Sequence, residues 1–184
     1  GVSGGWTPAV HLFTQSGGKL KFREEDQVFI PNTYPSNQIS IGSSNGDFTL
    51  DEILINTPKS LKEFLNIKNT EYDNLEVISS INKSKRNIWL LPSDKVLGKT
   101  KSFVDYQNDA TAKDIKLALR EGFRSIEHVK RYTTTGMGTD QGKLGNMHAL
   151  GIISETAGAK MGELGTTTFR PPYTPLTFGT IVGR

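Results

Sequence analysis

Alternating apolar and polar residues near the start of the chain predict a short β-hairpin. Leu20 and Phe22 fall on one face of residues 19–22, and residues 27–30 form a second apolar run after four charged residues. A period of two is typical of half-buried strands, although the turn lacks the glycine that is common in hairpins. Residues 38–41 have the same pattern and predict a third strand.

A glycine-rich turn at residues 42–46 and a helix follow the third predicted strand. The helix is expected to begin at Thr49, because Glu52 stands three residues later and the two can form a capping box. Free amides at a helix start favour anionic oxygen, so this arrangement is suited to a dinucleotide. It is also common in α/β proteins, and the G-x-G-x-x-G fingerprint is absent. The candidate cofactor-binding residues are Gly42, Asn45 and Gly46.

The middle of the chain predicts a second, separate helix and little regular structure after it. Thr57 followed by Pro58 is a favourable helix start. Residues 69–87 are rich in Asn, Lys and Ser and predict a loop, with a strand considered only at residues 75–78. Residues 88–92 predict a strand that a proline ends. The side chains expected on one face of the helix are Leu61, Phe64, Leu65 and Lys68.

The second half of the chain has the pattern of three short helices. Thr111 and Asp114 form a capping box for the first, and Gly122 suits its C-terminal end. Ser125 begins the second helix and Gly136 ends it. The side chains expected to face inward are Ile115, Ala118 and Leu119 from the first helix, and Ile126, Val129 and Tyr132 from the second.

The third helix is expected over residues 140–156, and an extended segment over residues 165–175. Leu144, Met147, Leu150 and Ile153 have helical spacing and would contribute to the core. The extended segment holds four threonines and three prolines, which disfavour a helix.

Charge and composition limit the possible functions. The 184 residues include 22 Lys or Arg and 19 Asp or Glu, which gives a net charge of +3. Residues 58–101 hold nine basic and five acidic residues, but no aromatic residues are interleaved as in nucleic-acid-binding segments, so a solvated surface is favoured over a nucleic-acid partner. A helix-turn-helix is disfavoured by the glycine-rich turns.

The absence of cysteine excludes disulfides, thiol nucleophiles and thiolate metal sites, and three histidines are too few and too scattered for a metal cage. We expect no membrane association, because the chain has neither a long apolar run nor a basic-then-apolar leader. A cytoplasmic location is the default expectation.

Two stretches resemble a small helical two-iron two-sulfur domain related to bacterioferritin-associated ferredoxin. Residues 105–111 (DYQNDAT) are similar to its C-x-C-E-E-V-T motif, and residues 136–145 (GMGTDQGKLG) are similar to its G-M-G-x-C-Q-G-R-x-C motif. Such a cluster needs four thiolates. The matching positions, which we call the vacated cluster positions, are Asp105, Gln107, Asp140 and Gly145.

A helical module without its cysteines is the pattern of one family, the alpha subunit of heterotetrameric sarcosine oxidase. Residues 121–143 resemble that family nearly residue for residue, and residues 3–12 and 166–175 resemble it at the two ends. The resemblance implies that the chain is a central piece of a larger subunit. It adds to the candidate cofactor-binding residues Gly4, Gly5 and Trp6, at the C-terminal end of a dinucleotide-binding domain.

The resemblance also implies the chemistry of the parent complex. The family oxidises sarcosine at a flavin held mainly by the beta subunit, passes the product to tetrahydrofolate on the alpha subunit, and binds NAD. No cofactor is expected on this chain alone. The partners implied are the other subunits, chiefly beta, and the nucleotide-binding and folate-binding domains of the same subunit.

Several side chains invite a chemical role. His128 could move protons, but no convincing partner is present in the sequence, so a hydrogen bond at the helix surface or a subunit contact is favoured. Arg131 and Arg170 are further candidates for subunit contacts. Asp105 and Asp140 are expected to lie close together if the cluster geometry is retained. They could hold a cation, but a hydrogen bond from Lys143 is favoured.

The fold class expected from these patterns is α+β, with the remnant of an α/β nucleotide-binding domain followed by a small three-helix module. The function expected is that of a structural and interdomain scaffold in a sarcosine oxidase alpha subunit. A free-standing nucleotide-binding module and a nucleic-acid-binding adaptor are the alternatives. The expected divisions are the dinucleotide-binding remnant at 1–56, a connecting segment at 57–101, the helical module at 102–165 and a linker at 166–184.

Overall fold

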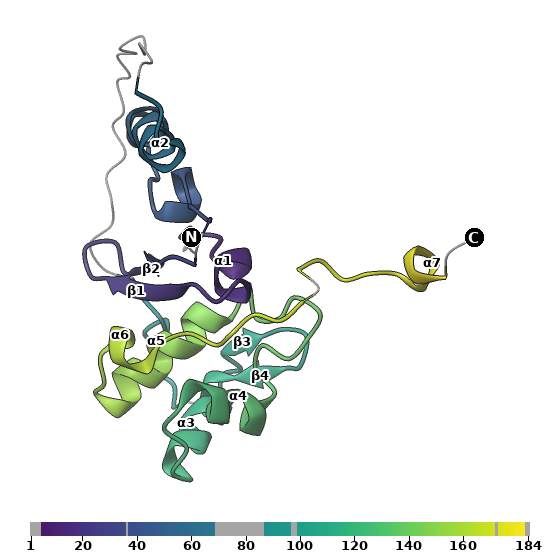
Figure 1. Cartoon of the computed structure of the whole chain (residues 1–184). Helices are drawn as coiled ribbons and strands as arrows, with labels where there is room; N and C mark the ends of the chain where they lie inside the picture. Colours follow the sequence, from purple (N-terminus) through teal and green to yellow (C-terminus); the bar gives the residue numbers. More distant parts are fainter. Residues whose placement is uncertain (1–4, 36, 69–86, 97–98, 172, 183–184) are drawn as a thin grey trace. The chain divides into compact units, whose positions relative to one another are not determined.

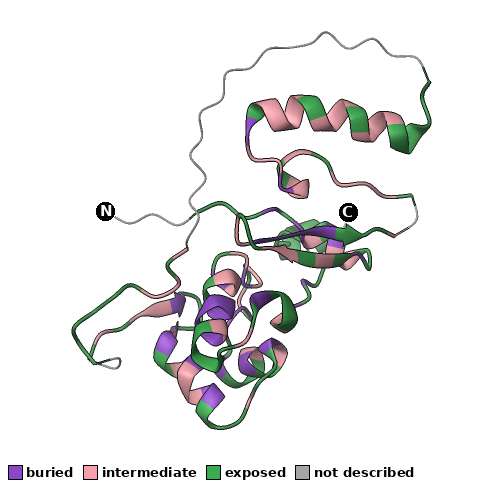
Figure 2. Ribbon diagram, turned by 90° about the vertical axis from the view of Figure 1, so that its left-hand side faces the viewer, coloured by how far each residue is buried: buried purple, intermediate pink, exposed green. Residues whose placement is uncertain are grey.

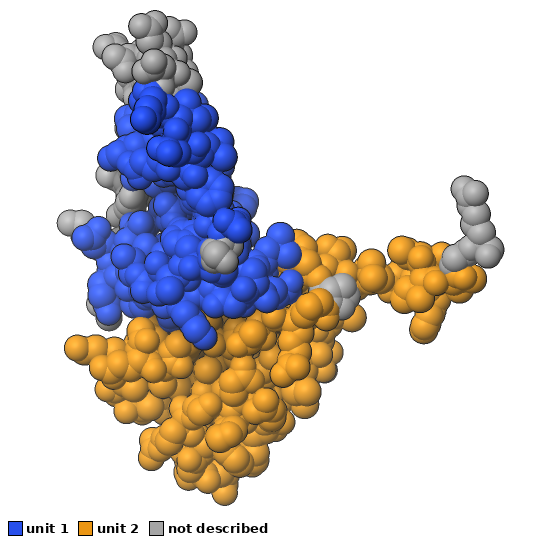
Figure 3. Space-filling view, viewed as in Figure 1, with its two compact units in different colours: residues 1–87 blue, residues 88–184 orange. Residues whose placement is uncertain are grey.

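The computed structural model describes residues 5–35, 37–68, 87–96, 99–171 and 173–182 (Figure 1). The chain divides into two compact units, residues 1–87 and residues 88–184, which Figure 3 colours separately. Each unit combines helices with a two-stranded antiparallel sheet, so the expected α+β class is confirmed. The elements of each unit are described separately below.

The first unit is built on the predicted hairpin. Strands β1 (Lys19–Arg23) and β2 (Val28–Thr33) pair antiparallel, with Phe22 opposite Phe29 and their ring centroids 5.0 Å apart. The turn has no glycine, and Gln27 takes the positive φ instead, at 55°. A short helix that the pattern did not indicate, α1 (His11–Gln15), precedes the hairpin.

The third predicted strand is wrong. Residues 38–41 are irregular, and a 3₁₀ helix, η1 (Gly42–Asn45), replaces the expected glycine-rich turn. The alternation of apolar and polar residues does not make this segment a strand, because a strand also needs a hydrogen-bonded neighbour. None of the described residues pairs with this segment.

Helix α2 (Leu50–Leu65) begins with the predicted capping box, in which the Thr49 hydroxyl accepts from the Glu52 amide. The prediction of a separate helix at Pro58 is wrong, because Pro58 lies inside α2. The missing N–H of Pro58 removes one hydrogen bond, but the helix continues to Leu65, and Asn66 is its C-cap. None of the residues of α2 is buried, as Figure 2 shows.

The predicted strand at residues 88–92 is also wrong, and residues 75–78 lie outside the described residues. The contacts of Trp89 give a reason why residues 88–92 do not form a strand. Its ring meets the ring of His148 edge-on, with centroids 6.2 Å apart, and a Cβ atom added to Gly151 would come within 2.2 Å of it. The apolar side chain is therefore used for packing against a helix and not for strand pairing.

The second unit is the helical module. Strands β3 (Phe103–Asp105) and β4 (Ala110–Thr111) form a short hairpin that leads into α3 (Ala112–Arg120). Helix α3 packs against both α4 (Ile126–Thr133) and α5 (Asn146–Ala157). The capping box of Thr111 and Asp114 and the N-cap at Ser125 are confirmed. The largest fully buried side chains of this unit are Ile115, Val129, Leu150, Ile152, Ile153 and Thr167.

Two predicted core residues and two predicted helix boundaries in this unit are wrong. Helix α4 ends at Thr133 with Thr134 as its C-cap, and not at Gly136. Tyr132 is 45% exposed and its ring lies 4.8 Å from that of Phe123, at the surface. Leu144 is 69% exposed, because residues 140–145 form turns and α5 begins only at Asn146. The described part of 165–175 has no helix, as predicted, whereas α6 (Met161–Leu164) and α7 (Phe178–Ile181) were not predicted.

Among the described residues, no helix combines the length and apolar character needed to cross a bilayer. Helix α2 includes residues 56 and 57, where the sequence suggested a domain boundary. The first compact unit ends at residue 87 and the second begins at residue 88. The domain divisions expected from sequence remain predictions.

Candidate functional site

The carboxylate of Asp105 organises the loops around the vacated cluster positions. Asp105 ends β3 and is 6% exposed. One oxygen accepts from the amides of Gln107 at 2.8 Å and Asn108 at 3.0 Å, and the other accepts from the amide of Gly136 at 2.6 Å. The last of these bonds joins segments 31 residues apart, so Asp105 connects the β3–β4 turn to the end of α4.

These hydrogen bonds set the charge state of Asp105. Burial raises the pKa of its carboxyl, but the amides of Gly136, Asn108 and Gln107 donate to the ionised form and together bring the pKa below the ordinary value of 3.8. Asp105 is therefore an anion at neutral pH, held by backbone dipoles.

Gln107 makes the second connection between the two loops. Its side-chain carbonyl accepts from the Asp140 amide at 3.1 Å, and its side-chain amide donates to the Thr139 hydroxyl at 2.8 Å. A Cβ atom added to Gly138 would lie 2.0 Å from the Gln107 carbonyl oxygen. Glycine at 138 therefore permits the loop to close on this side chain.

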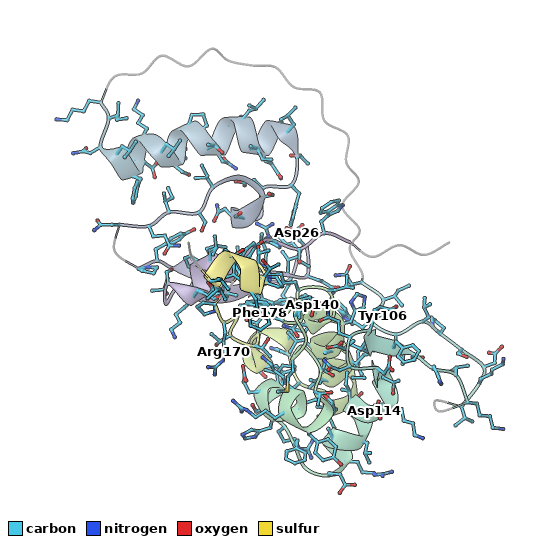
Figure 4. The ribbon with its side chains drawn as sticks, turned by 90° about the vertical axis from the view of Figure 1, so that its right-hand side faces the viewer. Asp26, Tyr106, Asp114, Asp140, Arg170 and Phe178 are labelled. Atoms are coloured by element: carbon cyan, nitrogen blue, oxygen red, sulfur yellow. The ribbon has the colours of Figure 1, made fainter. Side chains whose placement is uncertain are left out.

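The remaining two vacated cluster positions lie on the same loop. The Asp140 carboxylate accepts from the Gly142 amide at 3.0 Å, and Figure 4 labels Asp140 within the helical module. Gly145 is the N-cap of α5, and a Cβ atom there would come within 2.5 Å of the Val104 carbonyl oxygen. The structure thus brings residues 105, 107, 140 and 145 together, from the β3–β4 turn and the loop before α5.

The side chains of this arrangement take part in hydrogen bonds. No group of three or more His, Asp or Glu side chains able to hold a metal ion occurs in the described part of the chain. Gly145 has no ligand atom in its side chain, and both oxygens of Asp105 already accept amides. The expected hydrogen bond from Lys143 to these carboxylates is not formed, because its ammonium donates to the Tyr173 carbonyl at 2.6 Å.

The extended segment 165–175, which we call the strap, is held against the helical module by side chains that the sequence did not single out. Glu127 accepts from the Thr168 amide at 3.2 Å, and Gln141 accepts from the Arg170 amide at 2.8 Å. Asn146 donates to the Thr167 hydroxyl at 2.8 Å, and Thr167 is 2% exposed. Each of these hydrogen bonds joins a side chain of a helix or loop to a distant residue of the strap. Such contacts depend on the folded structure and could not be predicted from the local sequence.

Replacing Asn146 with alanine is expected to lower the free energy of unfolding by about 1–2 kcal/mol, because the buried hydroxyl of Thr167 loses its partner. Limited proteolysis should also cut the strap faster. The matched control is Thr156→Ala, an exposed position on the same helix, which should leave both properties unchanged. Equal proteolysis rates for the two variants would contradict this role of Asn146.

A cavity of about 550 Å³ lies beside the vacated cluster positions, between α4, the loop at 136–141 and the strap. Its lining includes Lys130 and Arg131 of α4, together with Arg170 of the strap, which Figure 4 labels. Of the predicted subunit contacts, Arg131 and Arg170 therefore line this cavity. His128 is exposed on α4 and does not line it.

The predicted nucleotide-binding residues of the first unit have other contacts. The Gly46 carbonyl accepts from Arg23 at 2.7 Å, and the Asn45 side chain accepts from Tyr34 at 3.0 Å. At the start of α2, one oxygen of Glu52 accepts from the amides of Phe48 and Thr49. This carboxylate therefore satisfies two backbone donors that precede the first turn of the helix.

Two of the residues predicted from the resemblance are exposed, and one is outside the described part. Gly5 is exposed, Trp6 is 89% exposed, and Gly4 lies outside the described residues. Gly42 is the first residue of η1 and has a φ of 63°. The role of Gly4, Gly5, Trp6, Gly42, Asn45 and Gly46 as a cofactor site remains a prediction.

The fold and site define a cysteine-free helical module joined to a small α+β unit. Residues 99–184 match the family model described as the sarcosine oxidase A3 domain. Over 99% of its length the chain is 37% identical to the sarcosine oxidase subunit alpha of Rhizobium meliloti, and over 100% it is 34% identical to that of Corynebacterium sp. strain P-1. The chain is thus similar over almost its whole length to sarcosine oxidase alpha subunits, and residues 99–184 match a domain model of that family.

The chain spans 18% of the Rhizobium meliloti subunit and 20% of the Corynebacterium subunit, or about a fifth of the curated relatives that it matches. Among solved structures, it is similar to L-proline dehydrogenase from P. horikoshii, with a TM-score of 0.57 and 22% sequence identity. That match covers 98% of this chain and 38% of the other, and it supports the fold alone.

Proposed function

We propose that this chain is the interdomain scaffold of a sarcosine oxidase alpha subunit and performs no redox chemistry by itself. The observation that carries the proposal is the gathering of residues 105, 107, 140 and 145, where hydrogen bonds take the place of cluster ligands. This site connects two loops and two helices without presenting a catalytic group. These four positions are the ones that the resemblance assigned to cluster ligands. A fold that was retained after its metal cluster was lost would still bring them together.

The parent complex proposed here oxidatively demethylates sarcosine, with flavin, NAD and tetrahydrofolate bound outside this segment. It is cytoplasmic and contains other subunits, of which beta is the chief contact of this one. The exposed side chains His128 and Arg131 are proposed subunit contacts, with Arg170 of the strap. The apolar residues exposed on α2 support a role within a larger assembly, because surface patches of this kind are commonly covered by partners. They are Leu50, Ile55, Phe64 and Leu65.

The proposal is tested in the assembled complex. An alpha subunit that contains this segment is co-expressed with its partner subunits, and complex yield and sarcosine-dependent oxygen uptake are measured. Asp105→Asn is expected to lower the yield of complex, whereas the KM for sarcosine of the complex that does assemble stays unchanged, because no substrate contact is lost. Asp94→Asn, at an exposed position of the same unit, is the control and should behave as the unaltered protein.

Two results would contradict this function. One is sarcosine oxidation by the 184-residue chain alone. The other is a changed KM for sarcosine in Asp105→Asn with normal assembly, which would place the residue at a substrate site. The sequence on either side of this segment gives a further check, since a nucleotide-binding fingerprint before it and a folate-binding domain after it are expected.

A further inference from the structure

The cavity beside α4 has the size and lining of a small-molecule site. Its volume of about 550 Å³ falls within the range of roughly 300–1,000 Å³ that is usual for ligand pockets. Its lining includes the apolar residues Met137 and Pro175, and also Gly138 and Thr139. All of its lining residues belong to the second unit.

The cavity has a net positive charge, because its cationic side chains outnumber its carboxylates. Three of its lining side chains are cationic, Lys130, Arg131 and Arg170, and one is anionic, Glu127. Glu127 is already engaged, because it accepts from the Thr168 amide at 3.2 Å and pairs with Arg131 at 3.6 Å. Within the ranges that the structure describes, neither Lys130 nor Arg170 forms an ion pair.

Two of the residues that line the cavity, Gly138 and Thr139, also have backbone amides without a hydrogen-bond partner in the described part of the chain. The amides before and after them do form hydrogen bonds. The amide of Met137 donates to the Thr134 carbonyl at 3.1 Å and that of Asp140 donates to Gln107 at 3.1 Å. Consecutive backbone amides that lie beside unpaired cations can act together as donors to an anion.

From this combination we infer that the cavity binds the phosphate group of a small molecule. Lys130 and Arg170 supply the cationic donors, and the amides of Gly138 and Thr139 supply the neutral ones. A phosphate monoester has three terminal oxygens and nearly two charges, so it matches two cations and two amides better than a carboxylate does. The rest of the ligand would contact Met137 and Pro175. This inference goes beyond the scaffold role and does not rest on it.

The test is a titration of the full 184-residue chain, followed by calorimetry or by amide chemical shifts. The probes are inorganic phosphate, adenosine 5′-monophosphate and adenosine. The first two should bind saturably and adenosine should not, and the shifts of the Gly138 and Thr139 amides should move. Tighter binding of the nucleotide than of phosphate supports a phosphate monoester as the ligand, and equal binding supports a site for the phosphate group alone.

Variants assign the binding to the cavity. Lys130→Gln and Arg170→Gln are each expected to weaken phosphate binding roughly tenfold, because each removes a charge-assisted hydrogen bond. The matched controls Lys113→Gln and Arg124→Gln change exposed cations outside the cavity and should leave the affinity unaltered. The inference is overturned if no phosphate probe saturates, if adenosine binds as well as its monophosphate, or if the cavity and control variants weaken binding equally.

Discussion

Replacing Asp105 with asparagine is expected to lower the free energy of unfolding of the chain by about 2–3 kcal/mol. The ionised carboxylate accepts three backbone amides, and the amide group of asparagine offers only one accepting oxygen. At least one buried donor then faces a second donor. Chemical denaturation of the two proteins at neutral pH measures the difference.

The control for this substitution is Asp94→Asn, because residue 94 is an exposed aspartate in the same unit. It should change the free energy of unfolding by less than about 0.5 kcal/mol. A loss for Asp105→Asn no larger than that of the control would show that the three hydrogen bonds do not stabilise the module.

The contribution of Asp105 should also depend on pH in a defined direction. Its pKa is below 3.8 in the folded chain, so the ionised form is favoured by folding. The stabilisation is therefore complete above the unfolded pKa near 3.8 and is lost as the pH falls through the lower folded value. The difference between the unaltered chain and Asp105→Asn should stay constant from pH 7 to about pH 5 and shrink under more acidic conditions. A difference that grows on acidification would contradict this assignment.

Replacing Gly145 with alanine is expected to lower the free energy of unfolding by about 2–3 kcal/mol. The φ of Gly145 is −103°, so the backbone itself tolerates alanine. The added Cβ atom, however, would lie 2.5 Å from the Val104 carbonyl oxygen, and this neighbour is backbone that cannot rotate away. Thermal and chemical denaturation should both detect the loss.

Gly179→Ala is the matched control, because a Cβ atom there meets only the Thr177 hydroxyl at 3.9 Å. It should leave the stability unchanged. The same geometry predicts that cysteine at all four vacated cluster positions would not rebuild a cluster without movement of β3, since position 145 has no space for a side chain. If Gly145→Ala is as stable as Gly179→Ala, residue 145 does not lie as close to the Val104 carbonyl oxygen as the structure indicates.

Local signals in the sequence predicted the starts of two helices, one in each unit, and one buried helix face. The capping boxes at Thr49 and Thr111 fix two helix starts, because each depends only on residues three positions apart. The buried stripe of α3, formed by Ile115, Ala118 and Leu119, follows from helical periodicity in the same way.

The wrong predictions of strands and core residues concern features that depend on tertiary contacts. Trp89 and residues 38–41 have strand-like patterns, but whether they pair depends on neighbours distant in the sequence. Leu144 has the spacing of a core residue, yet the loop at 140–145 is held by Asp140 and Gln107 and points it outward into solvent. The hydrogen bonds of the strap are of the same kind, because they join residues 21 to 41 positions apart.

The candidate site was partly predictable. The resemblance indicated that Asp105, Gln107, Asp140 and Gly145 would gather, and the structure brings them together. The side chain expected to bond the carboxylates, Lys143, instead donates to Tyr173 of the strap. The cavity next to this site joins Lys130 to Arg170, which are 40 positions apart, and no local pattern indicates such a pair.

Hydrogen exchange of individual amides, followed by NMR, tests the central claim most directly. If the Asp105 carboxylate has replaced metal ligands as the connection between the loops, the amides of Gln107, Asn108 and Gly136 should exchange slowly, and all three should lose protection in Asp105→Asn. Fast exchange of these amides in the unaltered chain, at the rate of exposed loops, would contradict the account.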